Sequence, residues 1–280
     1  MRRRTVSGAR VLLTGASSGI GRALAVRLAE RGAVLALTAR RTELLDEAAE
    51  EIADAGHLRP RVLPADLAVP GVAAELGQRA LATLGGIDLL INNAGANMTA
   101  AQAVAADDEQ ARAVFETNLW TPLALTKAVL PAMRAAGRGV IVNTTSTVQA
   151  IPIPLLGYYA ASKAALARAT SALRLELAGT GIRVVEVVPG STDTALRDID
   201  ELPWKGSPPP TLPAISPEAM AAAIVRALER GRTRVVHPGY SRAPLEVPVV
   251  GRLVAALAAT RVDTRRMLDD AEPGTDWCRP

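Results

Sequence analysis

A glycine-rich turn between an apolar segment and a helical segment constrains this chain most. Residues 9–14 (Ala-Arg-Val-Leu-Leu-Thr) have the composition of a short buried strand, and residues 22–31 have a helical pattern that ends at Gly32. The turn between them reads Thr14-Gly15-Ala16-Ser17-Ser18-Gly19-Ile20-Gly21. Glycines permit a tight turn and close approach of a ligand, and a helix start offers free N–H groups to a pyrophosphate. The turn therefore predicts a dinucleotide site. Its glycine spacing differs from G-x-G-x-x-G, and an ordinary Gly/Ser turn is the alternative.

Strand-like segments alternate with helical segments along most of the chain. The six longer strand-like segments and a short seventh are residues 9–14, 33–38, 61–65, 87–91, 140–146, 182–188 and 234–236. Such alternation indicates right-handed βαβ units, which form a parallel sheet with helices on both faces. No linker or internal repeat divides the chain, so we expect an α/β fold in one domain.

Composition and charge argue against several kinds of function. The formal net charge is +4, and no basic block alternates with aromatic residues, so we expect no nucleic-acid partner. Cys278 is the only cysteine, which excludes an intrachain disulfide and a cysteine metal cluster, and we expect no metal site. No apolar stretch is long enough for a spanning helix or a signal peptide, so we expect a cytoplasmic protein.

Polar residues follow the predicted strands, at the edge where open α/β sheets bind ligands. Arg40 and Arg41 follow the second strand, where an arginine favours a ribose 2′-phosphate; solvated arginines at a helix start are the alternative. Asp66 follows the third strand and would either accept a hydrogen bond from an adenine amine or cap the next helix. Asn92-Asn93-Ala94-Gly95 follows the fourth strand, as a turn against a flat ligand or a turn that caps itself.

Tyr159 and Lys163 lie four residues apart in a helix predicted over residues 155–178. Positions i and i+4 share one helix face, and an ammonium beside a phenol favours the phenolate. We therefore expect the pKa of Tyr159 to fall from about 10 toward the working pH, which suits a general acid/base. Taken alone, such a pair is more often an ordinary solvated face.

A second polar residue stands out because its position is unfavourable. Asn118 falls inside the helical region predicted over residues 107–136, although Asn has a low helix propensity. Pro122 follows four residues later, so we expect a local kink at this place.

The ordered set of motifs resembles the short-chain dehydrogenase/reductase family over roughly residues 8–240. The set comprises Thr14-Gly15-x-x-x-Gly19-x-Gly21, Asn92-Asn93-Ala94-Gly95, Asn118, Ser146, Tyr159-x-x-x-Lys163 and Pro189-Gly190. The resemblance implies a Rossmann-like, doubly wound parallel sheet of about seven strands, in a catalytic domain of residues 1–240. It also implies a nicotinamide cofactor and hydride transfer to or from a carbonyl or alcohol carbon. Residues 241–280 would form a helical extension and tail, to which the resemblance assigns no role.

The resemblance also implies roles for single residues. Tyr159 would be the general acid/base, and Lys163 would bind the nicotinamide ribose and lower the Tyr159 pKa. Ser146, which lies 13 residues before Tyr159, would hold the substrate oxygen. Asn118 would fix a water that links Lys163 to solvent. Tyr158 would not be catalytic, because Ser162 rather than a lysine follows it by four residues.

The remaining implied residues would bind the cofactor, with NADP(H) preferred through Arg40 and NAD(H) as the other possibility. They are Gly15, Ser17, Ser18, Gly19 and Ile20 at the pyrophosphate, Arg40 at the 2′-phosphate, Asp66 and Leu67 at the adenine, Asn92, Ala94 and Gly95 on the adenosine side, and Pro189, Gly190, Thr192 and Thr194 at the nicotinamide. Tyr159 and Lys163 would contact the cofactor as well.

The substrate side would be built from residues 147–156 and a loop at about 194–215. Its side chains are mainly apolar, which suits a hydrophobic ketone or secondary alcohol. Two alternatives stay open: a catalytically silent nucleotide sensor, and a lipid- or steroid-type dehydrogenase docked on a membrane through residues 243–262. That last segment would otherwise pack on the body or on a second subunit, and the resemblance implies a homodimer or homotetramer.

Overall fold

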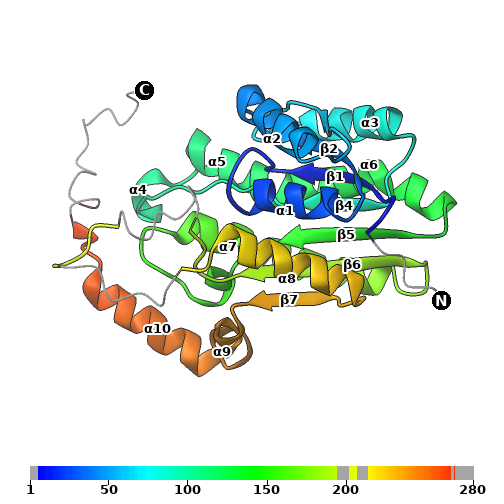
Figure 1. Cartoon of the computed structure of the whole chain (residues 1–280). Helices are drawn as coiled ribbons and strands as arrows, with labels where there is room; N and C mark the ends of the chain where they lie inside the picture. Colours follow the sequence, from blue (N-terminus) through cyan, green and yellow to red (C-terminus); the bar gives the residue numbers. More distant parts are fainter. Residues whose placement is uncertain (1–5, 194–201, 207–213, 266–267, 269–280) are drawn as a thin grey trace.

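The computed structural model describes residues 6–193, 202–206, 214–265 and 268, and Figure 1 shows their arrangement. Seven strands form one sheet in the order β3-β2-β1-β4-β5-β6-β7, and every neighbouring pair is parallel. The strands are β1 Arg10–Thr14, β2 Val34–Thr38, β3 Arg61–Val62, β4 Leu89–Asn92, β5 Gly139–Thr144, β6 Ile182–Pro189 and β7 Arg234–His237. The predicted fold class and the number of strands are confirmed.

Helices cover both faces of the sheet and give it two separate cores. On one face, α1 Gly19–Ala29, α2 Thr42–Asp54 and α8 Pro217–Glu229 pack on the strands through residues such as Leu24, Leu45 and Ile224. On the other face, α3 Val72–Leu84, α6 Thr121–Ala135 and α7 Gly157–Glu176 do so, and Leu76 and Leu125 belong to that core. Strands buried on both faces are uniformly apolar, as in Val11-Leu12-Leu13 of β1.

The sequence placed most elements within a few residues, and two differences are the largest. Strand β3 ends at Val62 rather than at residue 65, although the N–H groups of Leu63 and Ala65 still donate to the carbonyls of Leu37 and Ala39 at 2.9 and 3.1 Å. The region predicted as one helix over residues 107–136 consists of α5 Glu109–Phe115, a π-helical turn at Glu116–Trp120, and α6. The structure therefore has a π turn where the kink near Asn118 was expected.

The part after β6 continues with α8, which Ser216 caps: its hydroxyl accepts a hydrogen bond from the Ala219 N–H at 3.2 Å. Beyond β7 lie α9 Arg242–Glu246 and α10 Pro248–Arg261. Within the described residues, no single helix has both the length and the apolar character to cross a bilayer. Residues 239–246 and 248–261 satisfy that test only when taken together, and a bend of 97° separates them.

Candidate active site

The carboxyl ends of the parallel strands share one edge of the sheet, and the predicted motifs lie there (Figure 1). The turn after β1 is fastened to the turn after β4. The Thr14 hydroxyl accepts hydrogen bonds from the backbone N–H groups of Asn93 and Ala94, both at 3.0 Å. In return, the Asn93 side-chain amide donates to the carbonyls of Thr14 and Gly15 at 3.2 and 3.3 Å. Asn93, which the sequence analysis did not assign, thus shapes the glycine-rich turn.

Neighbouring atoms lie so close to the first and last glycines of this turn that neither position can hold a side chain. Gly15 has φ +68°, and a Cβ added to it would lie 2.8 Å from the Ala94 Cα. A Cβ on Gly21 would overlap the Gly15 carbonyl oxygen and lie 2.7 Å from the Asn93 amide nitrogen. Backbone atoms and the Asn93 amide thus fill the space beside both glycines, which leaves no room for a side chain at either position.

This turn leads into the N-terminus of α1 in a form that fits a pyrophosphate. Ser18, the N-cap, is extended at φ −160°, and its own side chain does not cap the first turn of the helix. The first N–H groups of α1, from Gly19 and Ile20 onward, are thus left for an anion, which the helix dipole favours. Ser17 is buried, whereas Ser18 is half-buried. These residues fit the dinucleotide that the motif implies.

Two exposed arginines follow β2, near the same turn. The Arg41 guanidinium donates to the Ser18 hydroxyl at 3.3 Å, so Arg41 reaches the phosphate turn. Arg40 is exposed as well. The resemblance assigns Arg40 to the 2′-phosphate, and the structure adds Arg41 as a second cation near this position.

Asp66 and Leu67 follow β3. The Asp66 carboxylate accepts a hydrogen bond from the Ala68 N–H at 3.0 Å and so stabilises its own turn. The helix after it begins at Val72 with Gly71 as the N-cap, so the alternative that Asp66 caps a helix is wrong. Leu67 is buried, and its carbonyl accepts from the Thr121 hydroxyl at 2.9 Å.

The Asn92 side chain lies inside the protein rather than at the ligand edge. Its amide donates to the Asn143 side-chain oxygen at 2.8 Å, and the Asn143 amide donates to the Thr170 hydroxyl at 2.9 Å. All three residues are buried, so this chain of amides joins β4, β5 and α7. Any contact between Asn92 and a cofactor would involve its backbone. Ala94 and Gly95 are half-buried at the edge.

Lys163 and Tyr159 lie side by side on α7, as their spacing predicted. The Lys163 ammonium is 5.8 Å from the centre of the Tyr159 ring, and it donates to the Thr144 carbonyl at 2.9 Å. Lys163 is buried, while Tyr159 is half-buried and thus reachable from the edge. Ser146 lies two residues beyond the end of β5, where its hydroxyl accepts from the Val148 N–H at 3.4 Å. The bond from Lys163 to Thr144 joins α7 to the strand that leads into Ser146.

Asn118 is fully buried in the π turn and is held by three hydrogen bonds. Its side chain accepts from the Ala96 N–H at 2.9 Å, donates to the Ala96 carbonyl at 2.8 Å, and donates to the Ser162 hydroxyl at 2.9 Å. The Ser162 hydroxyl donates in turn to the Tyr159 carbonyl at 2.8 Å. Ser162 therefore joins the π turn to the helix that carries Tyr159 and Lys163. In the sequence, this role of Ser162 is indicated only by its place directly before Lys163.

The neighbouring tyrosine has a structural role. The Tyr158 hydroxyl donates to the carbonyls of Ala106 and Gln102 at 2.6 and 3.3 Å, and burial raises its pKa. This agrees with the choice of Tyr159 over Tyr158.

The segment after β6 is shaped by another close approach. A Cβ on Gly190 would lie 2.5 Å from the Ser241 hydroxyl and 2.8 Å from the Pro238 ring. Thr192 is buried, donates to the Gly190 carbonyl at 3.1 Å and pairs with Ile215. Thr194 lies outside the described residues.

A buried acid behind the site was missed by the sequence analysis. Glu186 lies in β6, and its carboxylate accepts from the Thr145 hydroxyl and the Gln149 amide, both at 3.2 Å. Arg234 of β7 pairs with the same carboxylate at 3.0 Å. Glu186 thus joins β6 to Thr145 and Gln149, which lie before and after Ser146 in the sequence. A lone acid within the apolar run of residues 182–188 was the signal that could have identified it.

Among the described residues, no group of three or more His, Cys, Asp or Glu side chains could hold a metal ion.

We expect the burial of Lys163 to make stability depend on pH. Burial lowers its pKa from 10.5 to about 8. Between these pH values the unfolded chain binds a proton that the folded chain does not, so the free energy of unfolding rises with pH across that window. Below about pH 8 both states bind the proton, and the cost of burying the charge is complete. The rise attributable to Lys163 should be ~3 kcal/mol at most.

Urea unfolding of the cofactor-free protein and of Lys163→Met across this window measures the effect. The variant should be the more stable at neutral pH, and its advantage should shrink as pH rises. A constant difference between the two proteins would contradict this account.

Comparison with known proteins supports the assignment that the geometry suggests. The family model for short chain dehydrogenase matches residues 9–201. The 11-beta-hydroxysteroid dehydrogenase-like 3 of Arabidopsis thaliana is 34% identical over 232 residues, which cover 83% of this chain and 74% of that protein. The ketoacyl reductase HetN of Nostoc sp. is 33% identical over 232 residues, covering 83% and 79%. With 11-beta-hydroxysteroid dehydrogenase 1A of Arabidopsis thaliana the identity is 37%, over 66% of this chain and 53% of that protein.

Solved structures of short-chain dehydrogenases have the same fold. A short-chain dehydrogenase from Sphingobium yanoikuyae in complex with NADPH superposes with a TM-score of 0.74 at 28% identity, covering 96% of this chain and 99% of the other. A short chain dehydrogenase/reductase from Burkholderia phymatum in complex with NAD has a TM-score of 0.75 at 22% identity, over 86% and 93%, and supports the fold alone. Family match, fold and the ordered strand-end residues coincide, and the chain belongs to the short-chain dehydrogenase/reductase family of oxidoreductases.

Proposed function

We propose that this protein is an NADP(H)-dependent carbonyl reductase or secondary alcohol dehydrogenase that acts on a hydrophobic substrate. The observation that carries the proposal is the pair on α7: a half-buried Tyr159 beside the buried ammonium of Lys163, 5.8 Å from its ring. When bound, the nicotinamide supplies or accepts the hydride. The residues described above would bind the cofactor and handle the proton.

In the reductive direction, the Tyr159 hydroxyl would give its proton to the oxygen of the substrate carbonyl. The Ser146 hydroxyl would hold the same oxygen, so that the two hydroxyls stabilise the negative charge that develops there; one such donor is worth ~2.7–4 kcal/mol in other enzymes. Lys163 would favour the phenolate that remains, because its positive charge lies beside the ring. Asn118 and Ser162 would keep α7 and the π turn in register.

The residues that we propose for the substrate side are mainly apolar, which supports a hydrophobic substrate. Ile153, Leu155 and Leu156 belong to a buried apolar cluster, against which Val148, Ile151 and Trp204 pack. Part of the predicted substrate loop, at residues 194–201 and 207–213, lies outside the described residues. Assaying NADPH oxidation against a panel of apolar ketones, aldehydes and polar keto acids tests the proposal. Turnover confined to the polar members, or absent throughout, would contradict it.

We expect NADP(H) to bind more tightly than NAD(H), because two exposed arginines follow β2 where the 2′-phosphate would lie. Substituting Arg40→Ala should weaken NADPH binding by about 10- to 100-fold, the range for a lost hydrogen bond to a charged group, and leave NADH binding unchanged. Fluorescence titration with both cofactors measures this. Arg41→Ala is the matched variant, which tells whether Arg41 shares the phosphate, and tighter binding of NADH by the unaltered protein would contradict the preference.

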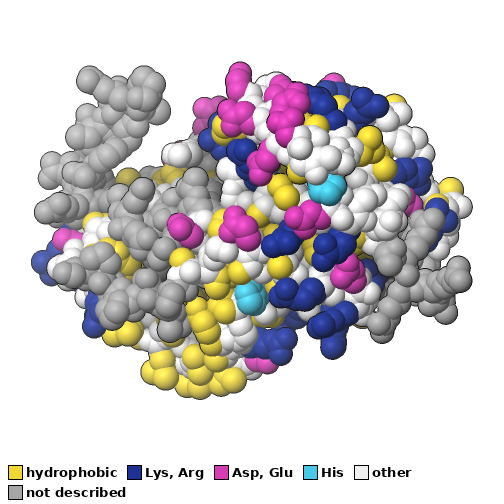
Figure 2. Space-filling view, viewed as in Figure 1, with side chains coloured by type: hydrophobic (Ala, Val, Ile, Leu, Met, Phe, Trp, Pro, Cys, Tyr) yellow, Lys and Arg dark blue, Asp and Glu magenta, His cyan; other side chains and the backbone are white. Residues whose placement is uncertain are grey.

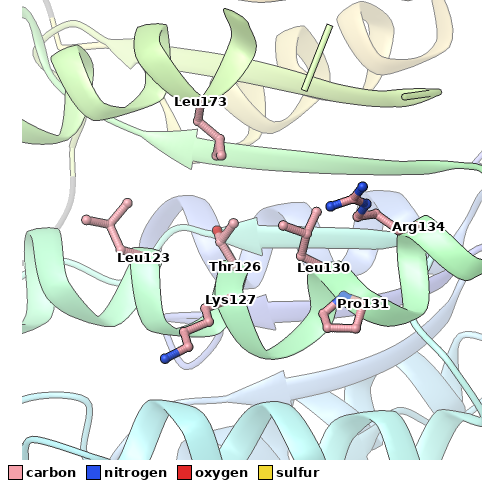
Figure 3. A pocket seen from close by; sticks show the side chains of 7 residues that line it. All are labelled: Leu123, Thr126, Lys127, Leu130, Pro131, Arg134 and Leu173. Atoms are coloured by element: carbon pink, nitrogen blue, oxygen red, sulfur yellow. The ribbon is translucent and has the colours of Figure 1, made fainter. Parts of the chain in front are cut away.

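We further propose that the protein forms a homo-oligomer through α6 and α7. A pocket of about 620 Å³ lies between them, lined by Leu123, Thr126, Lys127, Leu130, Pro131, Arg134 and Leu173 (Figure 3). An apolar hollow on long helices suits a second subunit. Leu123→Asp should lower the molar mass measured by light scattering to that of the monomer, whereas Leu58→Asp, at an exposed leucine elsewhere, should not. A monomeric unaltered protein would contradict the proposal.

A further inference from the structure

The helix α10 presents an apolar stripe that the protein body does not cover. Val249, Leu253 and Leu257 recur every four residues and are 49%, 66% and 55% exposed. Side chains at this spacing lie along one helix face. Val247, at the junction with α9, is 46% exposed and lengthens the stripe. Figure 2 shows hydrophobic side chains gathered at the lower edge of the molecule, over α9 and α10. Exposed apolar surface of this kind marks an interaction site.

The opposite face of α10 packs against the protein body. The exposed stripe is therefore not the face that anchors this helix. Gly251 is buried, and a Cβ added to it would lie 2.7 Å from the Ala150 carbonyl oxygen. Ala258 packs against the apolar cluster that contains Ile153 and Leu155, and Val262 just beyond the helix is buried in that cluster. The helix is therefore held against the body with its stripe pointing outward.

The charges around the stripe favour an anionic partner. With 3.6 residues per turn, Arg252 and Arg261 lie on opposite flanks of the stripe. The described helix, Pro248–Arg261, contains no acidic residue. Glu246, just before it, lies 3.6 Å from Arg234, which also pairs with Glu186. A second copy that paired stripe on stripe would bring arginines together with no acid in the helix to match them.

We propose that α10 docks this protein on an anionic lipid surface. Val249, Leu253 and Leu257 would enter the boundary of the acyl chains, while Arg252 and Arg261 would contact the phosphates of the headgroups. An apolar face with basic flanks is the composition of helices that lie in a membrane interface. Anionic lipids attract such arginines within a Debye length, so the binding depends on salt.

Flotation of the full chain with vesicles tests the docking. The vesicles are phosphatidylcholine mixed with phosphatidylglycerol, and phosphatidylcholine alone. The unaltered protein should float with the anionic vesicles and be released by high salt. The double variant Leu253→Glu/Leu257→Glu should lower the bound fraction by at least ~tenfold, because both side chains leave the interface. Leu58→Glu, at a leucine that is 63% exposed and far from α10 in the sequence, is the matched control and should bind normally.

A second variant tests the docking independently in case the first variant folds poorly. Arg252→Gln/Arg261→Gln leaves the apolar stripe intact and should reduce binding to anionic vesicles to the level seen on phosphatidylcholine. The proposal is overturned if the protein stays unbound on both kinds of vesicle, or if both double variants float like the unaltered protein. It is equally overturned if light scattering shows a dimer that only Leu253→Glu/Leu257→Glu dissociates, because the stripe is then covered by a second copy.

Discussion

Replacing Tyr159 by Phe should lower turnover by about 10²- to 10⁴-fold while NADPH affinity stays within a factor of about two, the range expected for loss of a general acid/base. The substitution removes one hydroxyl and leaves the ring beside the Lys163 ammonium, so the fold of α7 is kept. Steady-state kinetics with the best carbonyl substrate and a separate NADPH titration measure the two quantities. Tyr159→Phe with turnover close to that of the unaltered protein would refute the proposed mechanism.

Tyr158→Phe is the matched control, since it removes the same atom from the adjacent residue. The Tyr158 hydroxyl is bonded to the carbonyls of Ala106 and Gln102, so its loss should cost ~1 kcal/mol of stability, as a typical hydrogen bond does. Turnover should be unchanged. If both variants lost activity equally, the effect would come from the helix rather than from one hydroxyl.

Replacing Gly21 by Ala should destabilise the protein by ~3 kcal/mol and weaken NADPH binding by at least tenfold. Most added methyl groups in a packed region cost ~1–3 kcal/mol, and here the obstructing atom is the backbone carbonyl oxygen of Gly15, which no side-chain rotation can move. The turn must shift to relieve the overlap, and its free N–H groups shift with it. Thermal or urea unfolding and an NADPH titration measure both effects.

Gly239→Ala is the control for this change. A Cβ at Gly239 would have no heavy atom of the described residues within 4 Å, so neither stability nor cofactor affinity should change markedly. Should Gly21→Ala leave the NADPH affinity intact, the glycine-rich turn would not be the pyrophosphate site, whatever the loss of stability.

Much of the architecture could be predicted because its signals are local. Apolar runs such as Val11-Leu12-Leu13 predict strands buried on both faces, and alternation with helices predicts a parallel sheet. Ser216 before Pro217 is a local pattern typical of a helix start, since the cap and the fixed φ of proline act within one turn. The pairing of Tyr159 with Lys163 was predictable for the same reason, because helix geometry alone sets it.

Other features depend on contacts between distant parts of the chain. The sequence could not tell that Asn92 faces inward, because its partner Asn143 lies 51 residues away on a neighbouring strand. Nor could it tell that Asn93, rather than Asn92, supports the glycine-rich turn. Glu186 reads as a lone acid in an apolar strand until β7 brings Arg234 to it.

The sequence by itself determined the βαβ order, the glycine-rich turn and the face of α7 that carries Tyr159 and Lys163, because each follows from spacing within one element. Only the tertiary structure decided what surrounds them. The burial that lowers the Lys163 pKa, the hydrogen bonds that lock Asn118 to Ser162, and the outward stripe of α10 all come from packing. Packing depends on which surfaces meet when the strands assemble, and such long-range contacts leave no periodic pattern in a single chain.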